Sequence, residues 1–168
     1  MQKESTLAVA LLALFAMPAL AQNPLGLDAE GRMTVTGSDA RLIAQIAQRV
    51  GDTDFTEDVI RTPHIVVHRD NGDVWFEGQF IGCSGGLECQ ALALVADFGA
   101  LGLTGDQLNS FNNEYYYVRA YANGQGAVIV QQDVMLTDGV NDVWLERAIR
   151  TFGHMADIFA QWSAENGG

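Results

Sequence analysis

The sequence is 168 residues long, 48% hydrophobic and 18% charged, and its formal net charge at pH 7 is −12. This length and composition predict one globular domain that can bury a core without the help of a metal. The acidity argues against nucleic acid and anionic membrane surfaces as partners, because phosphate-rich surfaces bind clustered Lys and Arg.

Residues 1–21 have the pattern of a secretory signal peptide. Lys3 supplies a positive start, Leu7 to Met17 is an unbroken apolar run, and Ala19-Leu20-Ala21 forms a small-x-small cleavage pattern. The apolar run is shorter than the roughly 20 residues that a membrane-spanning helix needs. We expect cleavage before Gln22, export to the periplasm or the medium, and no membrane insertion after the leader is removed.

After the leader, residues 22–37 are rich in Gly and small polar residues and predict a flexible lead-in to a single domain over 38–168. Ser38-Asp39 offers an N-cap for a helix over 40–50, and Gly51 would end it. Its apolar residues fall at helical spacing, which predicts one buried face: Leu42, Ile43, Ile46 and Val50.

An acidic cluster follows, but its spacing does not match a calcium-binding loop. Such a loop needs Gly at its sixth position, and the sixth residue counted from Asp52 is Glu57. Asp52, Asp54, Glu57 and Asp58 therefore predict a solvated connection.

Two strands are predicted over 63–69 and 74–81, joined by a tight turn at Asn71-Gly72. Strict alternation along the second strand predicts a core face and an opposite face. The expected core face holds Val74, Phe76, Gly78 and Phe80, and the opposite face holds Trp75, Glu77, Gln79 and Ile81.

Cys83 and Cys89 are the two cysteines, and they flank a Gly-rich turn between two predicted strands. Facing positions at the mouth of such a turn lie within the distance that a disulfide accepts. In an exported protein the compartment is oxidising, which favours a structural disulfide. A redox-active pair is the alternative, but catalytic dithiols usually form Cys-x-x-Cys at a helix start.

The remaining predicted elements are a strand over 90–98, a helix over 105–114 capped by Thr104, strands over 115–122 and 127–136, and an amphipathic helix over 141–164. The register of the second hairpin stays open, because a two-residue loop and a longer loop pair different faces. The order α-β-β-β-α-β-β-α predicts an α+β fold, an antiparallel sheet with flanking helices.

Candidate functional side chains are few. His64 and His68 lie four residues apart on one strand and could contribute to an enzyme site, but a zinc site needs at least a third ligand, so neither metal nor cofactor is expected. Aromatic and Arg side chains are frequent in protein interfaces. The candidates for partner binding are Trp75, Tyr115, Tyr117, Arg119 and Tyr121.

Three further polar residues are assigned structural roles. Asn109 and Asn112 share one helix face and could hold a neighbouring loop through their amides, the alternative being contact with a partner. Asp133 lies on the strand next to that of Arg119 and could form an ion pair with it.

From the cysteine turn onward the sequence resembles the YbjN-domain family of bacterial proteins. The resemblance rests on six groups of residues in order: Cys83 and Cys89; Leu92-Ala93-Leu94 with Asp97-Phe98-Gly99; Leu108-Asn109-Ser110-Phe111-Asn112; Val118-Arg119-Ala120-Tyr121; Gln132-Asp133-Val134; and Gly139-Val140. It implies a fold like that of the type III secretion chaperones and a regulatory description without a catalytic mechanism.

Together these features predict a non-enzymatic, exported binding or chaperone-like module that acts through a protein or peptide partner, in envelope stress or signalling. A homodimer is also expected, since the chaperones that it resembles commonly pair. The alternative is an enzyme whose site involves His64 and His68.

Overall fold

The computed structural model describes residues 27, 30–58, 62–85 and 88–167. Within them lie three helices, α1 (Ala40–Ala47), α2 (Gly105–Glu114) and α3 (Asp142–Asn166). The strands are β1 (Thr34–Val35), β2 (Asp52–Glu57), β3 (Pro63–His68), β4 (Val74–Ile81), β5 (Ala91–Asp97), β6 (Arg119–Ala122), β7 (Val128–Met135) and β8 (Val140–Asn141).

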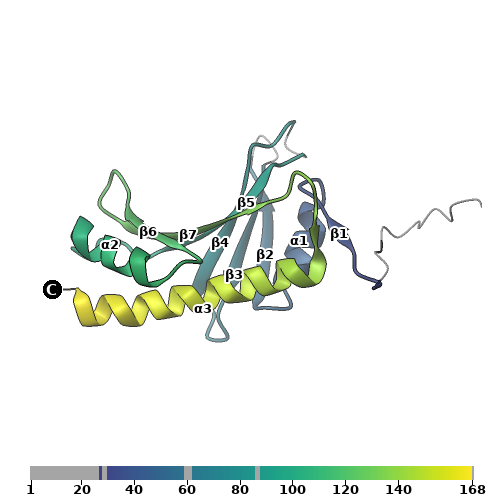
Figure 1. The fold of residues 1–168 in the computed structure, drawn as a ribbon. Coiled ribbons are helices and arrows are strands. Elements are labelled where there is room, and N and C mark those ends of the chain that lie inside the picture. The colour runs from purple at the N-terminus through teal and green to yellow at the C-terminus, as the bar shows by residue number, and fades with distance from the viewer. Residues whose placement is uncertain (1–26, 28–29, 59–61, 86–87, 168) are drawn as a thin grey trace, which may run out of the picture.

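Six of the strands form one antiparallel sheet in the order β2-β3-β4-β5-β7-β6, and β1 pairs with β8 in a separate two-stranded ribbon. The long helix α3 crosses one face of the sheet, with α1 near one end and α2 near the other (Figure 1). The predicted α+β class, with an antiparallel sheet and flanking helices, is confirmed.

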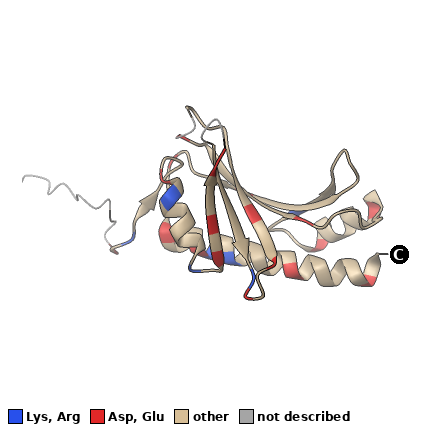
Figure 2. Cartoon of the chain, turned by 180° about the vertical axis from the view of Figure 1, so that it is seen from behind, with Lys and Arg blue, Asp and Glu red and all other residues tan. Residues whose placement is uncertain are grey.

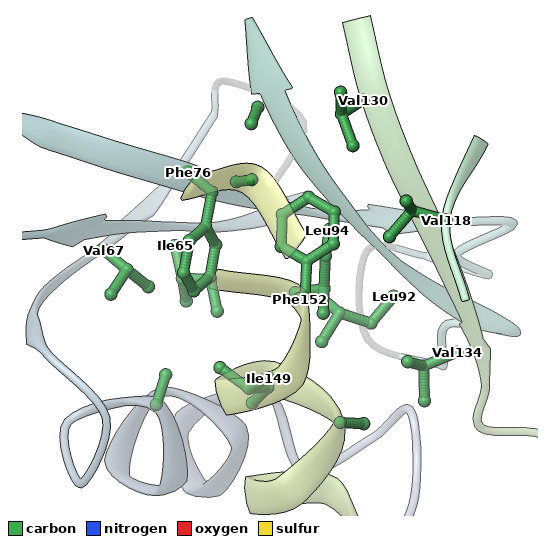
Figure 3. Packing of buried hydrophobic residues seen from close by; sticks show 14 of the residues in the cluster. Ile65, Val67, Phe76, Leu92, Leu94, Val118, Val130, Val134, Ile149 and Phe152 are labelled. Carbon is green, nitrogen blue, oxygen red and sulfur yellow. The ribbon is translucent and has the colours of Figure 1, made fainter. Parts of the chain in front are cut away.

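The core lies between α3 and the sheet. Phe152 of α3 meets Phe76 of β4 edge to face at 5.2 Å between ring centroids, and Ile149 and Leu94 lie beside them (Figure 3). Farther along α3, Phe159 contacts Phe111 of α2 at 4.9 Å. The apolar stripe predicted for the last helix is therefore the face that packs on the sheet.

The acidic segment after α1 is a strand, so the predicted solvated connection was wrong. Asp52–Glu57 pairs along its whole length with β3 and forms one edge of the sheet. Thr53 is buried and Phe55 packs against the core, whereas Asp52 and Asp54 are exposed. Alternating acidic residues suit an edge strand, because charges oppose pairing with another chain.

A bulge changes the faces predicted for the first hairpin. Val67 pairs with Phe76 and His68 pairs with Val74, so Trp75 has no partner on β3. An extra residue of this kind redirects the side chains around it. Val74 is 56% exposed, and Trp75 packs against α3; Phe76, Gly78 and Phe80 keep their predicted places in the core.

The predicted signal peptide and its cleavage site lie outside the described residues. The lead-in predicted over 22–37 contains β1, where Val35 is fully buried and pairs with Val140. The strand predicted from Tyr115 begins only at Arg119, because the Tyr115 N–H still bonds to the Phe111 carbonyl at 2.9 Å and ends α2.

The predicted disulfide joins Cys83 and Cys89, whose Cα atoms lie 3.8 Å apart in the loop between β4 and β5. This loop docks on the segment before α1. The Cys89 N–H donates to the Gly37 carbonyl at 3.3 Å, and a Cβ at position 37 would overlap the Cys89 carbonyl oxygen. Only glycine allows so close a backbone approach.

Candidate functional site: the open face of the sheet

The helices cover one face of the six-stranded sheet and leave the other accessible. In Figure 2, the view from behind, the strands lie in front of α3. We call this surface the open face. By strand register and alternation, its central residues are Glu77, Gln79 and Ile81 of β4, Ala91, Ala93 and Val95 of β5, Ile129, Gln131, Asp133 and Met135 of β7, and Arg119 and Tyr121 of β6.

Four side chains of the open face form a continuous polar network on β6 and β7. The Tyr121 hydroxyl donates to Gln131 Oε1 at 2.7 Å, and Gln131 Nε2 donates to Asp133 Oδ1 at 2.6 Å. Asp133 Oδ2 accepts from Arg119 Nη2 at 3.0 Å, and the Arg119 guanidinium lies 5.8 Å from the centre of the Tyr121 ring. The predicted Arg119–Asp133 pair is thus part of a larger arrangement.

The turn of the second hairpin sets the register that assembles this network. Five residues, 123–127, connect β6 to β7. Asn123 Oδ1 accepts from the N–H groups of Gln125 and Ala127 at 2.9 and 3.0 Å, and the Asn123 N–H donates to the Ala127 carbonyl at 2.8 Å. The resulting register pairs Arg119 with Gln131, which puts the four side chains on one face.

Helix α2 holds the free edge of β6 through one amide. Asn112 Oδ1 accepts from the Ala120 N–H at 2.7 Å, and Asn112 Nδ2 donates to the Ala120 carbonyl at 2.9 Å. Asn109 lies on the same helix and is exposed. Of the two asparagines predicted to act structurally, Asn112 forms the contact that fixes β6.

Beside the network, one row across three strands is apolar. Ala91 pairs with Ile81 on one side and with Met135 on the other. Ile81 and Met135 are exposed, and the small Ala91 between them is buried. The open face therefore combines an ordered polar region with an adjacent apolar row, a composition that suits contact with a protein.

The comparison with protein families matches residues 39–165 to YbjN, described as "Putative bacterial sensory transduction regulator". The chain belongs to the YbjN family. The match begins just before α1 and ends within α3, so it includes the whole six-stranded sheet. A search of curated proteins found no match. None of the helices described is long and apolar enough to cross a membrane.

In this YbjN-family chain, Trp75 is engaged within the molecule. Its indole Nε1 donates to Asp157 Oδ1 at 3.1 Å, and the Arg69 guanidinium, paired with Asp157 at 2.6 Å, lies 5.2 Å from the ring centre. A Cβ at Gly153 would come within 2.5 Å of the indole. Trp75 thus joins the bulge of β4 to α3.

The three consecutive tyrosines before β6 have different surroundings. Tyr115 stacks on Phe111 at 4.6 Å, and loss of solvation, followed by the neighbouring Glu114 carboxylate, raises the pKa of its hydroxyl. Tyr116 and Tyr117 are 85% and 70% exposed, and Tyr121 on the open face is 38% exposed. Tyr117, Arg119 and Tyr121 are therefore accessible among the residues predicted to bind a partner.

The two strand histidines of this YbjN-family protein contact different carboxylates. His64 Nε2 is 3.1 Å from Glu77 Oε2, and His68 Nε2 is 3.1 Å from Asp54 Oδ2. They line different clefts, and the third histidine, His154, is exposed on α3. Among the described residues, no group of three His, Cys, Asp or Glu is placed to hold a metal.

Sequence reasoning missed Gln131, which connects Tyr121 to Asp133 and is itself nearly buried. The sequence does contain a pattern that places Gln131 beside Asp133, because residues two apart on a strand share a face. Gln131 could not be assigned to the open face from the sequence alone, because that assignment depends on the register of the hairpin formed by β6 and β7.

Proposed function

We propose that this YbjN-family protein is a non-enzymatic, exported binding module whose open face contacts a protein or peptide partner in envelope stress or signalling. The observation that carries the proposal is the one-sided arrangement of the helices, which leaves a six-stranded sheet with an accessible, organised face (Figure 1). The family description as a transduction regulator supports a role exercised through another molecule.

The chemistry of the open face favours a protein partner. Arg119 and Tyr121 are of the residue types that most often dominate interface energetics. Their contacts with Gln131 and Asp133 hold them in place before binding, which lowers the entropy cost of ordering them in a complex. Ile81 and Met135 add apolar area that a partner could bury.

Site-specific photo-crosslinking in the native host tests this proposal. A photoreactive residue replaces Tyr121 on the open face or, as the control, the exposed Gln161 on α3. We expect a discrete crosslinked product from position 121 only. Arg119→Glu, introduced in addition, should abolish that product, whereas the same change at exposed Arg41 of α1 should not. Identical products at 121 and 161, or none at either, would contradict the proposal.

Export is the second part of the proposal. The predicted signal peptide over 1–21 motivates it, and the Cys83–Cys89 disulfide is compatible with an oxidising compartment. Mass spectrometry of fractionated cells should find a mature chain that begins at Gln22 in the periplasm or the medium, with no free thiols before reduction. A chain that retains Met1 in the cytoplasmic fraction, with two free thiols, would contradict export.

Self-association is the third part. We expect a homodimer, and size-exclusion chromatography with light scattering measures it directly on the mature chain. A mass near that of one mature chain would exclude the dimer while leaving the crosslinking result unaffected, so the two parts can fail separately.

A further inference from the structure

A second accessible surface lies at the start of α3, on residues separate from those of the open face. It is a cleft of about 490 Å³, which we call the α3 cleft. Its lining comes from the segment before β1, from β8 and from the first turns of α3: Arg32, Val140, Asn141, Val143, Trp144 and Arg147. Trp144 is 50% exposed and Val143 is 42% exposed, so a large apolar area faces solvent here.

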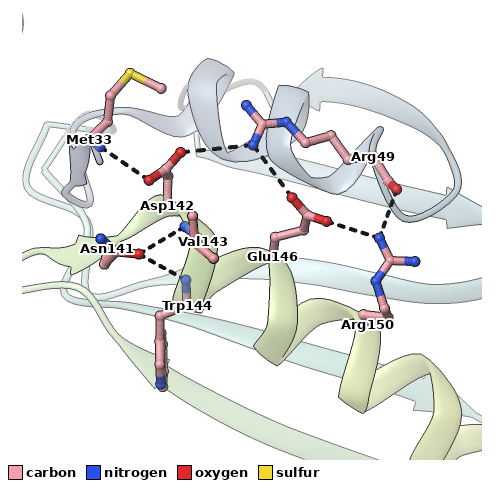
Figure 4. Close-up of polar contacts among 8 residues, drawn as sticks. All are labelled: Met33, Arg49, Asn141, Asp142, Val143, Trp144, Glu146 and Arg150. Atoms are coloured by element: carbon pink, nitrogen blue, oxygen red, sulfur yellow. Dashed lines mark hydrogen bonds and ion pairs between the residues drawn. The ribbon is translucent and has the colours of Figure 1, made fainter. Parts of the chain in front are cut away.

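The backbone around the α3 cleft is held firmly. Asn141 Oδ1 accepts from the N–H groups of Val143 and Trp144 at 3.0 and 3.1 Å and caps the helix (Figure 4). The buried Asp142 exchanges two hydrogen bonds with the Met33 backbone, at 3.0 and 3.1 Å. In Figure 4 the Trp144 ring points away from these contacts. The exposed indole of Trp144 is thus attached to a backbone that hydrogen bonds already hold in place. Such an arrangement suits a binding role, because binding costs less conformational entropy when the site is ordered beforehand.

The guanidinium of Arg147 adds a positive charge to the lining of the α3 cleft. In the part of the chain that the structure describes, it is exposed and forms no salt bridge. Each of the other described arginines lies within 3.5 Å of a carboxylate: Arg32, Arg41, Arg49, Arg69, Arg119 and Arg150. In a chain with 21 acidic residues and a net charge of −12, Arg147 is thus an exposed guanidinium that is available to a carboxylate of another molecule.

We propose that the α3 cleft binds an acidic peptide segment in which an apolar side chain stands beside a carboxylate. The apolar side chain would pack on Trp144 and Val143, and the carboxylate would pair with Arg147 through charge-assisted hydrogen bonds. The cleft has room for one such anchor. A peptide is favoured over an anionic bilayer because the net charge of −12 repels an extended negative surface, whereas a single carboxylate responds to the charge within about 8–10 Å.

Titration of the ¹⁵N-labelled mature chain with short blocked peptides tests this proposal, followed by the indole N–H signal of Trp144. The probe is acetyl-Glu-Phe-Glu-amide, and its isosteric control is acetyl-Gln-Phe-Gln-amide. We expect saturable shifts of the Trp144 signal with the first peptide and affinity at least about tenfold lower for the second, the size expected for a lost charged hydrogen bond. Trp144→Phe identifies the signal.

Two matched substitutions complete the design. Arg147→Gln should weaken the acidic peptide about tenfold or more, whereas Arg41→Gln, which removes an equal charge on α1, should leave its affinity unchanged. Preserved dispersion of the amide spectrum shows that each variant is folded. Equal affinity for the two peptides, or no saturable shift at Trp144, would overturn the proposal. Broadening of Trp144 by anionic phospholipid vesicles without any response to the peptide would also overturn it and indicate a membrane contact.

Discussion

The two faces of the six-stranded sheet differ in what their side chains contact, although the same strands build both. On the helix-covered face, β7 contributes Val130 and Val134 to an apolar core. On the open face, the alternate residues Gln131 and Asp133 contact polar neighbours on β6. The comparison indicates that the covered face provides most of the stability, because burial of apolar area is the main favourable term in folding. The open face is the surface for which we propose partner binding.

The largest expected contrast follows from truncating one side chain on each face. Phe152→Ala removes a fully buried ring from the contact with Phe76 and should lower the free energy of unfolding by about 3–5 kcal/mol. Met135→Ala, at a residue 63% exposed on the open face, should change it by less than about 0.5 kcal/mol. Urea unfolding of both variants measures this, and similar losses would remove the distinction between the faces.

Overpacking the covered face should have a smaller effect. Gly153→Ala places a Cβ within 2.5 Å of the Trp75 indole. The overpacking costs about 1–3 kcal/mol, and the better helix propensity of Ala returns about 1 kcal/mol, so we expect a net loss of up to about 2 kcal/mol in thermal or urea unfolding. In a Trp75→Leu background the same change should be neutral or stabilising. A persistent loss there would mean that Trp75 is not the group displaced.

Two adjacent glutamines on β7 should respond in opposite directions. Gln132 points to the covered face, opposite Leu94, and its buried Oε1 accepts no hydrogen bond from the described residues. Gln132→Leu should therefore stabilise the protein by about 1 kcal/mol. Gln131→Leu breaks the open-face network and should cost about the same. Chemical unfolding of the two variants measures both changes in the free energy of unfolding. If both substitutions stabilised the protein, or both destabilised it, the environments assigned to Gln131 and Gln132 would be wrong.

The smallest effect concerns pH on the helix side. The Arg150 hydrogen bond to Glu146, aided by Arg49, lowers the pKa of Glu146 below its usual value. A depressed folded-state pKa means that the stabilisation is full above the ordinary pKa of about 4.3 and is lost as pH falls through the lowered pKa. Unfolding measured between pH 7 and pH 3 should lose more stability in the natural chain than in Glu146→Gln. An equal loss of stability in the two proteins would show that the contact between Glu146 and Arg150 does not stabilise the fold.

The order of the helices and of strands β3 to β7, and most of the core, could be predicted because the spacing of hydrophobic residues indicates which side chains are buried. The apolar stripe of α3, which includes Ile149, Phe152 and Phe159, could be predicted from helical spacing alone. The edge strand β2 was missed because Phe55 is its single large apolar residue and its acidic residues are typical of loops. Local composition cannot show that a neighbouring strand, here β3, supplies the pairing.

The candidate site was harder to predict because it depends on register. Arg119 and Asp133 could be named as a possible ion pair because they lie on adjacent predicted strands, but only the structure gives the register in which they meet. Trp75 was assigned to the open face by strict alternation, and one bulge residue reversed that assignment. Bulges and loop lengths are decided by contacts distant in sequence, such as the one between Trp75 and Asp157.

The contact between Asn112 and Ala120 has a consequence for the protein at high concentration. A terminal strand with free N–H and C=O groups is a template on which strands of other molecules can add. The side-chain amide of Asn112 accepts from the N–H of Ala120 and donates to its carbonyl, as the backbone of a further strand would do. At this position of the edge, the backbone groups of Ala120 are therefore not free to pair with a strand of another molecule.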